Sequence, residues 1–134
     1  MNPTYDFTGR VAFVTGASSG MGLATARAFA ESSAAVTLAD INDEALRAAE
    51  RQLAGAGHRV LATRCDVAEE DQVADAIAKT VETFGSLDLA YNAGIQSPAT
   101  DAAEETVEVF DRVNAINLRG IWASMKHELA QMRA

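Results

Sequence analysis

The chain has 134 residues, of which 49% are hydrophobic and 22% charged, a balance typical of one globular domain with its own core. Its formal net charge of −8 argues against nucleic acid as a partner, because an acidic chain repels the phosphate backbone. No apolar stretch approaches the ~20 residues that span a bilayer, and residues 1–9 lack a basic segment followed by an apolar run, so we expect neither membrane insertion nor a secretory signal, and a cytoplasmic location.

Short apolar runs alternate along the chain with alanine-rich or amphipathic segments. A continuous apolar run predicts a buried strand, and apolar residues spaced three and four apart predict a helix. In chain order the predicted elements are a strand at 10–15, a glycine-rich turn at 16–22, a helix at 23–31, a strand at 35–39, a helix at 43–54, a strand at 59–65, a helix at 69–84, a strand at 87–91, a polar loop at 92–100 and a helix from about 104 to 134. This alternation predicts a parallel sheet with helices on both faces.

The glycine-rich turn lies between the first strand and the first helix, where a phosphate-binding turn must lie. Gly16 allows a tight turn, Gly20 allows the backbone to approach a pyrophosphate, and Gly22 allows the helix to pack closely on the strand. The free N–H groups at the start of the helix would face the anion. We therefore predict a dinucleotide site that Ser19 and Met21 also line; the alternative is a glycine-rich turn selected for its geometry alone.

Asp40 ends the second strand, 18 residues beyond Gly22. A carboxylate there can accept hydrogen bonds from the hydroxyls of the adenosine ribose, and it would repel a 2′-phosphate, which favours NAD over NADP. The alternative is a turn or cap residue, since the neighbouring Asn42 and Asp43 also favour such positions.

Five phrases occur together in a fixed order: T-G-A-S-S-G-M-G at 15–22, A-D-I at 39–41, C-D-V at 65–67, N-A-G at 92–94 and F-D-R-V-N-A-I-N-L-R-G at 110–120. With this order and spacing the chain resembles the classical short-chain dehydrogenase/reductase family from Phe7 to its last residue. The resemblance implies an α/β fold with a Rossmann-type doubly wound parallel sheet in the strand order 3-2-1-4. We expect residues 1–134 to form one incomplete NAD-binding domain, truncated after the fifth helix and lacking strand five onward.

In this family the segment that corresponds to Asp66 and Val67 lies against the adenine ring of the cofactor. The alternative for Asp66 is a helix capping arrangement with Glu69, three residues later. By the same resemblance, Asn92 and Gly94 border the cofactor ribose and help tie the central sheet together.

Asn117 corresponds to a member of the family's catalytic tetrad, which is thought to hold a water in a proton relay. The alternative for Asn117 is a buried helical asparagine that bonds the backbone. The family's proton-transferring Tyr, the Lys four residues after it and an upstream Ser have no counterpart here, because the only tyrosines, Tyr5 and Tyr91, are followed at that spacing by Gly9 and Ile95.

The segment from Asp88 to Gly94 is one residue shorter than the family pattern, which usually reads Asn-Asn-Ala-Gly. Removing one residue from a strand reverses the facing of every side chain on one side of the deletion. Either a flanking turn absorbs the change or the fourth strand is out of register, which would affect Asn92 and place the Tyr91 ring where a smaller group belongs.

The resemblance implies an NAD-dependent oxidoreductase that transfers hydride between the nicotinamide and an alcohol or carbonyl substrate. We expect the 134 residues alone to be inactive; the alternative is a non-catalytic dinucleotide-binding fragment or interaction module. We predict no metal site, and an inert buried thiol at Cys65. We also expect a homo-oligomer, because apolar side chains of the last helix should be exposed: Phe110, Val113, Ile121, Trp122 and Met125.

Overall fold

A computed structural model describes residues 3–134 as a parallel sheet covered by helices on both faces. Its four strands are β1 (Val11–Thr15), β2 (Ala35–Asp40), β3 (Val60–Arg64) and β4 (Leu89–Tyr91). They are hydrogen-bonded in the order β3-β2-β1-β4, and each neighbouring pair is parallel. The predicted α/β class and strand order are confirmed.

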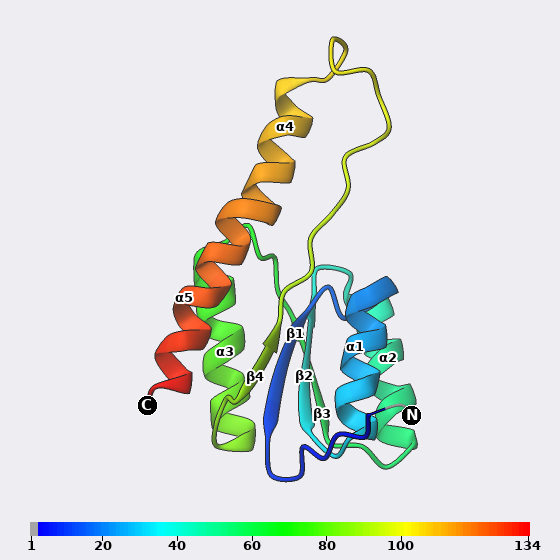
Figure 1. Cartoon of the computed structure of the whole chain (residues 1–134), viewed down its shortest axis with the longest axis vertical. Helices are drawn as coiled ribbons and strands as arrows, with labels where there is room; N and C mark the ends of the chain where they lie inside the picture. Colours follow the sequence, from blue (N-terminus) through cyan, green and yellow to red (C-terminus); the bar gives the residue numbers. More distant parts are fainter. Residues whose placement is uncertain (1–2) are drawn as a thin grey trace.

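The helices lie in two layers (Figure 1). Helices α1 (Gly20–Glu31) and α2 (Asp43–Gly55) cover one face of the sheet, and α3 (Glu70–Phe84) and α5 (Ile121–Met132) lie on the other. Each face has its own apolar core. Ala12 and Val14 of β1 belong to the core beneath α1 and α2, whereas Phe13 belongs to the core beneath α3. All of β1 is buried because successive strand side chains point to opposite faces and both faces are covered.

The last helical region differs from the uninterrupted helix expected from about residue 104. It begins with α4 (Val107–Asn114), continues through a π-helical segment η1 (Ala115–Gly120), and ends with α5. Thr106 caps the start of α4 by accepting a hydrogen bond from Val109 N at 3.3 Å. The expected start was therefore three residues early, and hydrophobic spacing did not predict the π-helical segment.

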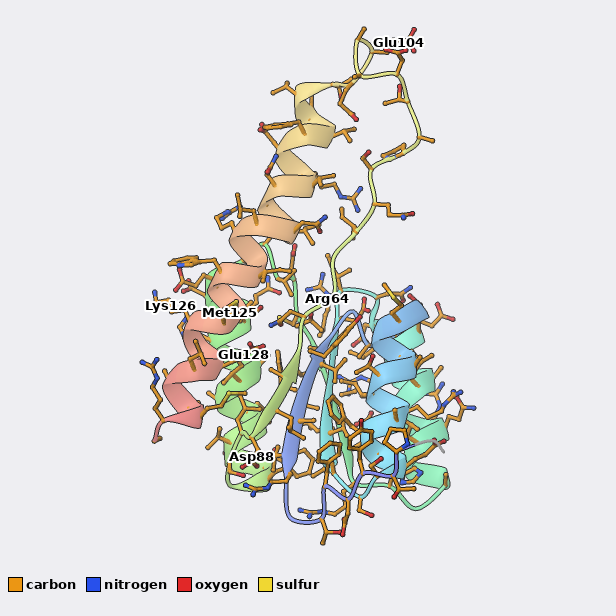
Figure 2. All side chains as sticks on the ribbon, viewed as in Figure 1. Arg64, Asp88, Glu104, Met125, Lys126 and Glu128 are labelled. Atoms are coloured by element: carbon orange, nitrogen blue, oxygen red, sulfur yellow. The ribbon has the colours of Figure 1, made fainter. Side chains whose placement is uncertain are left out.

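Helix α4 and the loop before it extend beyond the carboxyl ends of the strands, with Glu104 near the tip of this projection (Figures 1 and 2). Of the apolar side chains expected to be exposed, Phe110, Trp122 and Met125 are exposed, whereas Val113 and Ile121 are half-buried. Within residues 3–134, no helix is both long enough and apolar enough to cross a membrane.

Candidate dinucleotide site

The carboxyl ends of all four strands meet at one edge of the sheet, and each is followed or ended by a segment predicted to bind the cofactor. The glycine-rich turn follows β1, Asp40 ends β2, Asp66 follows β3 and Asn92 follows β4. The strand order places β2 and β3 on one side of β1 and β4 on its other side. The order of the strands therefore reverses at β1, and this edge contains the topological switch point at which open α/β sheets bind ligands.

The glycine-rich turn has the backbone conformation that its sequence predicts. Gly16 and Gly20 have φ angles of 62° and 54°, in the left-handed region that glycine adopts at little cost. A Cβ on Gly22 would lie 2.0 Å from Gly16 O, so only glycine allows α1 to approach the turn this closely. A Cβ on Gly20, by contrast, would meet no atom within 4 Å. The start of α1 is therefore bordered by open space on this side.

The first turn of α1 is suited to an anion. Ser19 is the N-cap residue, its side chain makes no capping hydrogen bond, and the first turn contains no acidic side chain. The N–H groups at a helix start lack intrahelical partners and carry the positive end of the helix dipole. The neighbouring Met21 is 77% exposed, so its side chain is available for contact with a ligand. These features fit the pyrophosphate of a dinucleotide.

The carboxylate of Asp40 joins the end of β2 to the glycine-rich turn. Its Oδ2 accepts a hydrogen bond from Ser18 N at 3.1 Å, and its Oδ1 accepts one from Asn42 N at 3.0 Å. Asp40 therefore stabilises the turn after β2, as the alternative prediction states. It does not cap α2, because the N-cap residue is Asn42, which accepts from Ala45 N at 3.2 Å. The bond from Ser18 N holds the Asp40 carboxylate beside the glycine-rich turn, so the ends of β1 and β2 meet at this point of the site.

Asp66 and Val67 form a turn before α3. Asp66 Oδ1 accepts from Ala68 N at 3.0 Å, and Asp66 N donates to Gln72 Oε1 at 2.9 Å. The alternative, in which Asp66 and Glu69 cap the start of α3, is wrong. The N-cap residue is Glu69, and its side chain makes no capping hydrogen bond. The carbonyl of Val67 lies close to η1, since a Cβ on Gly120 would be 2.9 Å from Val67 O.

The segment 92–95, which follows β4, is held by side chains from three different elements. Ala93 N donates to Thr15 Oγ1 of β1 at 3.0 Å, and Asn92 Nδ2 donates to Glu128 Oε2 of α5 at 3.0 Å. In addition, Asn117 of η1 donates to and accepts from the backbone of Ile95 at 2.7 and 2.8 Å. The backbone-bonding alternative for Asn117 is therefore what the structure contains, and both polar atoms of its side chain are engaged.

Two members of this cluster, Thr15 and Glu128, had no role in the sequence predictions. Thr15 is buried at the end of β1, and its place as the first residue of the T-G-A-S-S-G-M-G phrase was the available signal. Glu128 is only 3% exposed, although a glutamate in a helix ordinarily indicates a solvated face. Burial raises the pKa of Glu128, while the hydrogen bond from Asn92 acts in the opposite direction.

The fourth strand pairs with β1 in consecutive register, from Ala12 with Leu89 to Val14 with Tyr91. Leu89 and Tyr91 pack against the core beneath α1 and α2, and the Tyr91 side chain is half-buried there. The side chain of Asn92 reaches the opposite side of the sheet, where it bonds Glu128. Residues 89–91 therefore pair with β1 without a break in register. The side chains from Leu89 to Asn92 point in turn to the two faces of the sheet.

Cys65 follows β3 and is 2% exposed. Burial, with a smaller contribution from the negative charge of Asp66, raises the pKa of its thiol to about 12. The predicted burial of Cys65 is confirmed, and the raised pKa disfavours the reactive thiolate at neutral pH.

Comparison with known proteins gives consistent matches over nearly the whole chain. The sequence profile of the family described as short chain dehydrogenase matches residues 10–134. Cis-4-hydroxycyclohexanecarboxylate dehydrogenase of Sinomonas cyclohexanicum is 46% identical over 129 residues, which are 96% of this chain and 51% of that protein. Levodione reductase of Leifsonia aquatica is 37% identical over 135 residues, which cover 98% of this chain and 51% of the reductase.

Solved structures match in the same way. A short chain dehydrogenase/reductase from Burkholderia phymatum in complex with NAD superposes with a TM-score of 0.90 at 30% identity, covering 96% of this chain and 46% of that one. NAD+-bound xylitol dehydrogenase also gives a TM-score of 0.90, at 36% identity, covering 94% of this chain and 49% of its own. The chain thus spans about half the length of the curated relatives it matches.

Proposed function

The chain belongs to the short chain dehydrogenase family, and we propose that it supplies the NAD-binding domain of an oxidoreductase that transfers hydride between NAD and an alcohol or carbonyl compound. The observation that carries this proposal is the convergence of the glycine-rich turn and the Asp40 carboxylate at the carboxyl edge of the sheet. Bound NAD would supply the hydride chemistry, and the protein would supply position and electrostatics.

Each predicted cofactor residue has a place in this proposal. The N–H groups around Ser19, Gly20 and Met21 would bind the pyrophosphate, while Gly16 and Gly22 allow the turn to form beneath it. Asp40 would bind the adenosine ribose. The turn at Asp66 and Val67 would border the adenine, and Asn92 and Gly94 would border the second ribose. The NAD complexes named in the matching structures support NAD as the cofactor.

The cofactor proposal is tested by calorimetry of the purified chain with NAD and NADP. NAD should bind more tightly, and D40A should narrow the difference, because the variant removes the charge that would repel a 2′-phosphate. D43A is a matched control, since Asp43 lies in the first turn of α2 and pairs with Arg47 rather than with the glycine-rich turn. Equal affinity of the unmodified chain for the two dinucleotides would refute the assignment of Asp40.

We further propose that these 134 residues alone do not turn over substrate. Neither tyrosine is followed by a lysine at the required spacing, and general acid–base groups contribute about 10²–10⁴-fold to such rates. In the complete protein Asn117 would be a member of the family's catalytic tetrad that holds a water in a proton relay; its alternative role, a bond to the backbone, is the contact it makes with Ile95. An assay against a panel of secondary alcohols tests this proposal, and turnover comparable to that of ordinary dehydrogenases would contradict it.

A second candidate is a non-catalytic dinucleotide-binding module, because the site that the described residues assemble is the dinucleotide site alone. The nucleotide sequence that follows the last codon distinguishes the two. A continuing reading frame that encodes the Ser and the Tyr-x-x-x-Lys pair supports the enzyme, whereas a stop codon supports the module.

The proposed partners are a small alcohol or carbonyl substrate and a second copy of the chain. The outer face of α5 and η1 exposes apolar side chains around a hollow of about 420 Å³, which Leu118, Trp122, Met125 and Leu129 help to line. Large exposed apolar surfaces mark sites of association, so we propose that this face meets a second copy.

A further inference from the structure

Glu128 is a buried carboxyl group with a single hydrogen-bond partner among the described residues. It lies on the side of α5 that faces β4, whereas Lys126 lies on the outer side of the helix (Figure 2). Its Oε2 accepts from Asn92 Nδ2 at 3.0 Å, and its Oε1 has no partner within residues 3–134. Asn92 Oδ1 is likewise buried without a partner in this part of the chain.

Stability alone does not explain a carboxyl at this position. A buried carboxyl loses its hydration, and one hydrogen bond from a neutral amide compensates for only part of that loss. An apolar side chain of similar volume is often as stabilising or more so at such a site. The partner of the carboxyl, Asn92, therefore indicates what Glu128 does.

Asn92 is the first residue of the segment that packs directly on the glycine-rich turn. A Cβ on Gly16 would lie 2.6 Å from Ala93 Cβ, and a Cβ on Gly94 would lie 2.7 Å from Asn117 Oδ1. A shift of this segment toward the turn would therefore press on Gly16, and a shift the other way would separate Ala93 from Thr15. The position of the segment and the shape of the candidate dinucleotide site are consequently linked.

We propose that Glu128 is a positioning residue of the dinucleotide site, which acts through Asn92 to hold the segment 92–95 against the glycine-rich turn. This inference rests on the proposed function, because the site it positions is the NAD site. Glu128 supplies the anchor from α5, as Thr15 supplies the anchor from β1 and Asn117 the anchor from η1.

The test compares three variants of the whole chain. E128M keeps the volume of the side chain and removes the bond to Asn92, so we expect NAD affinity to fall about tenfold with little loss of stability. E128Q should retain NAD affinity, because its amide oxygen can accept from Asn92 Nδ2 and its amide nitrogen can donate to Asn92 Oδ1. E70Q is the control, since Glu70 bonds Lys126 and His127 and thus contacts α5 without contacting Asn92; its NAD affinity should be unchanged.

Amide hydrogen exchange provides a readout that does not require a cofactor. The amides of Ala93 and Ile95, which donate to Thr15 and Asn117, should exchange faster in E128M and at the parent rate in E128Q and E70Q. Unchanged exchange at both amides in a folded E128M would overturn the proposal. If the parent binds NAD, an E128M variant with the same NAD affinity as the parent would overturn it too. If the parent binds no NAD, the proposed function fails, while the exchange rates still decide whether Glu128 positions the segment.

Discussion

Asn117 and Ile95 are joined by two hydrogen bonds that connect the π-helical segment to the loop after β4. Asn117 Nδ2 donates to Ile95 O at 2.7 Å, and Asn117 Oδ1 accepts from Ile95 N at 2.8 Å. One side chain thus satisfies both backbone polar groups of a residue that lies outside any helix or strand. π-helical segments often occur at functional sites, and this one places Asn117 beside Gly94.

Removing this side chain should destabilise the protein. N117A leaves both backbone groups of Ile95 without their partner, and we expect the free energy of unfolding to fall by about 1–3 kcal/mol in urea titrations. N114A is the matched control, because Asn114 is half-buried like Asn117 but makes only an exposed bond, to Phe110 O within α4; its effect should stay within about 0.5 kcal/mol. Equal effects of the two substitutions would contradict a special role for the Asn117–Ile95 link.

Replacing Gly22 and Gly55 by alanine should change the stability of the protein in opposite directions. A Cβ on Gly22 would lie 2.0 Å from Gly16 O, so G22A should cost about 3 kcal/mol or more, or prevent folding. Gly55 ends α2 and a Cβ there meets nothing within 4 Å, so G55A should be neutral or stabilising by up to about 1 kcal/mol. Thermal melts of both variants test this contrast, and a G22A variant as stable as G55A would show that the close helix–turn contact is wrong.

The ionisation of Glu128 predicts a pH dependence of stability. Burial raises its pKa above the ordinary value of 4.5, so the folded state holds the proton more tightly than the unfolded state does. The resulting stabilisation is complete below the unfolded pKa and is lost as the pH rises through the folded pKa. E128Q cannot ionise, so its stability relative to the parent should increase as the pH rises above the ordinary value of 4.5.

E70Q provides the comparison of opposite sign. Hydrogen bonds from Lys126 and then His127 lower the pKa of Glu70, so its contribution is present above the ordinary value and is lost as the pH falls through the folded pKa. Relative to the parent, E70Q should therefore gain stability as the pH falls, whereas E128Q gains it as the pH rises. Urea unfolding from pH values well below 4.5 up to neutral pH measures both trends, and a pH-independent difference between E128Q and the parent would contradict the raised pKa of Glu128.

The outer edge of β3 is blocked by two side chains of α2. Ala62 N donates to Glu50 Oε1 at 2.8 Å, and Arg47 donates to Ala62 O at 3.1 Å. Because β3 is an edge strand, E50A should leave an open N–H group and increase self-association through strand pairing, which sedimentation velocity detects. E44A removes a charge from the exposed start of α2 and should leave the sedimentation profile unchanged. Identical profiles for parent and E50A would refute this edge-protection role.

The apolar face of α5 should govern assembly of the chain. Trp122 and Met125 are 54% and 48% exposed, so W122E combined with M125E should shift the sedimentation profile toward smaller species. V107E places a charge on an apolar position of α4 that is even more exposed, at 64%, and should have less effect. A monodisperse monomer in the unmodified chain would contradict the proposed second copy.

The sequence by itself determined the element order, the parallel sheet and the location of the glycine-rich turn. These features depend on local patterns. The apolar run of β1 predicts burial on both faces, and the glycine spacing at 16–22 predicts a tight turn wherever the chain goes afterwards. The strand order and the identity of the binding edge came from resemblance to a family with the same motifs, and the sheet confirms that order.

Only the tertiary structure decided which polar side chains support the site. Asn92 and Glu128 are 36 residues apart, and Thr15 and Ala93 are 78 apart, so no local period relates either pair. Glu128 resembles any solvated glutamate of a helix until α5 packs against α3 and the Glu128 side chain is buried. Hydrophobic spacing also leaves the α and π forms of residues 115–120 undistinguished. The reason is physical: burial and hydrogen-bond partners across a sheet depend on how finished elements pack, and that information is absent from any short window of sequence.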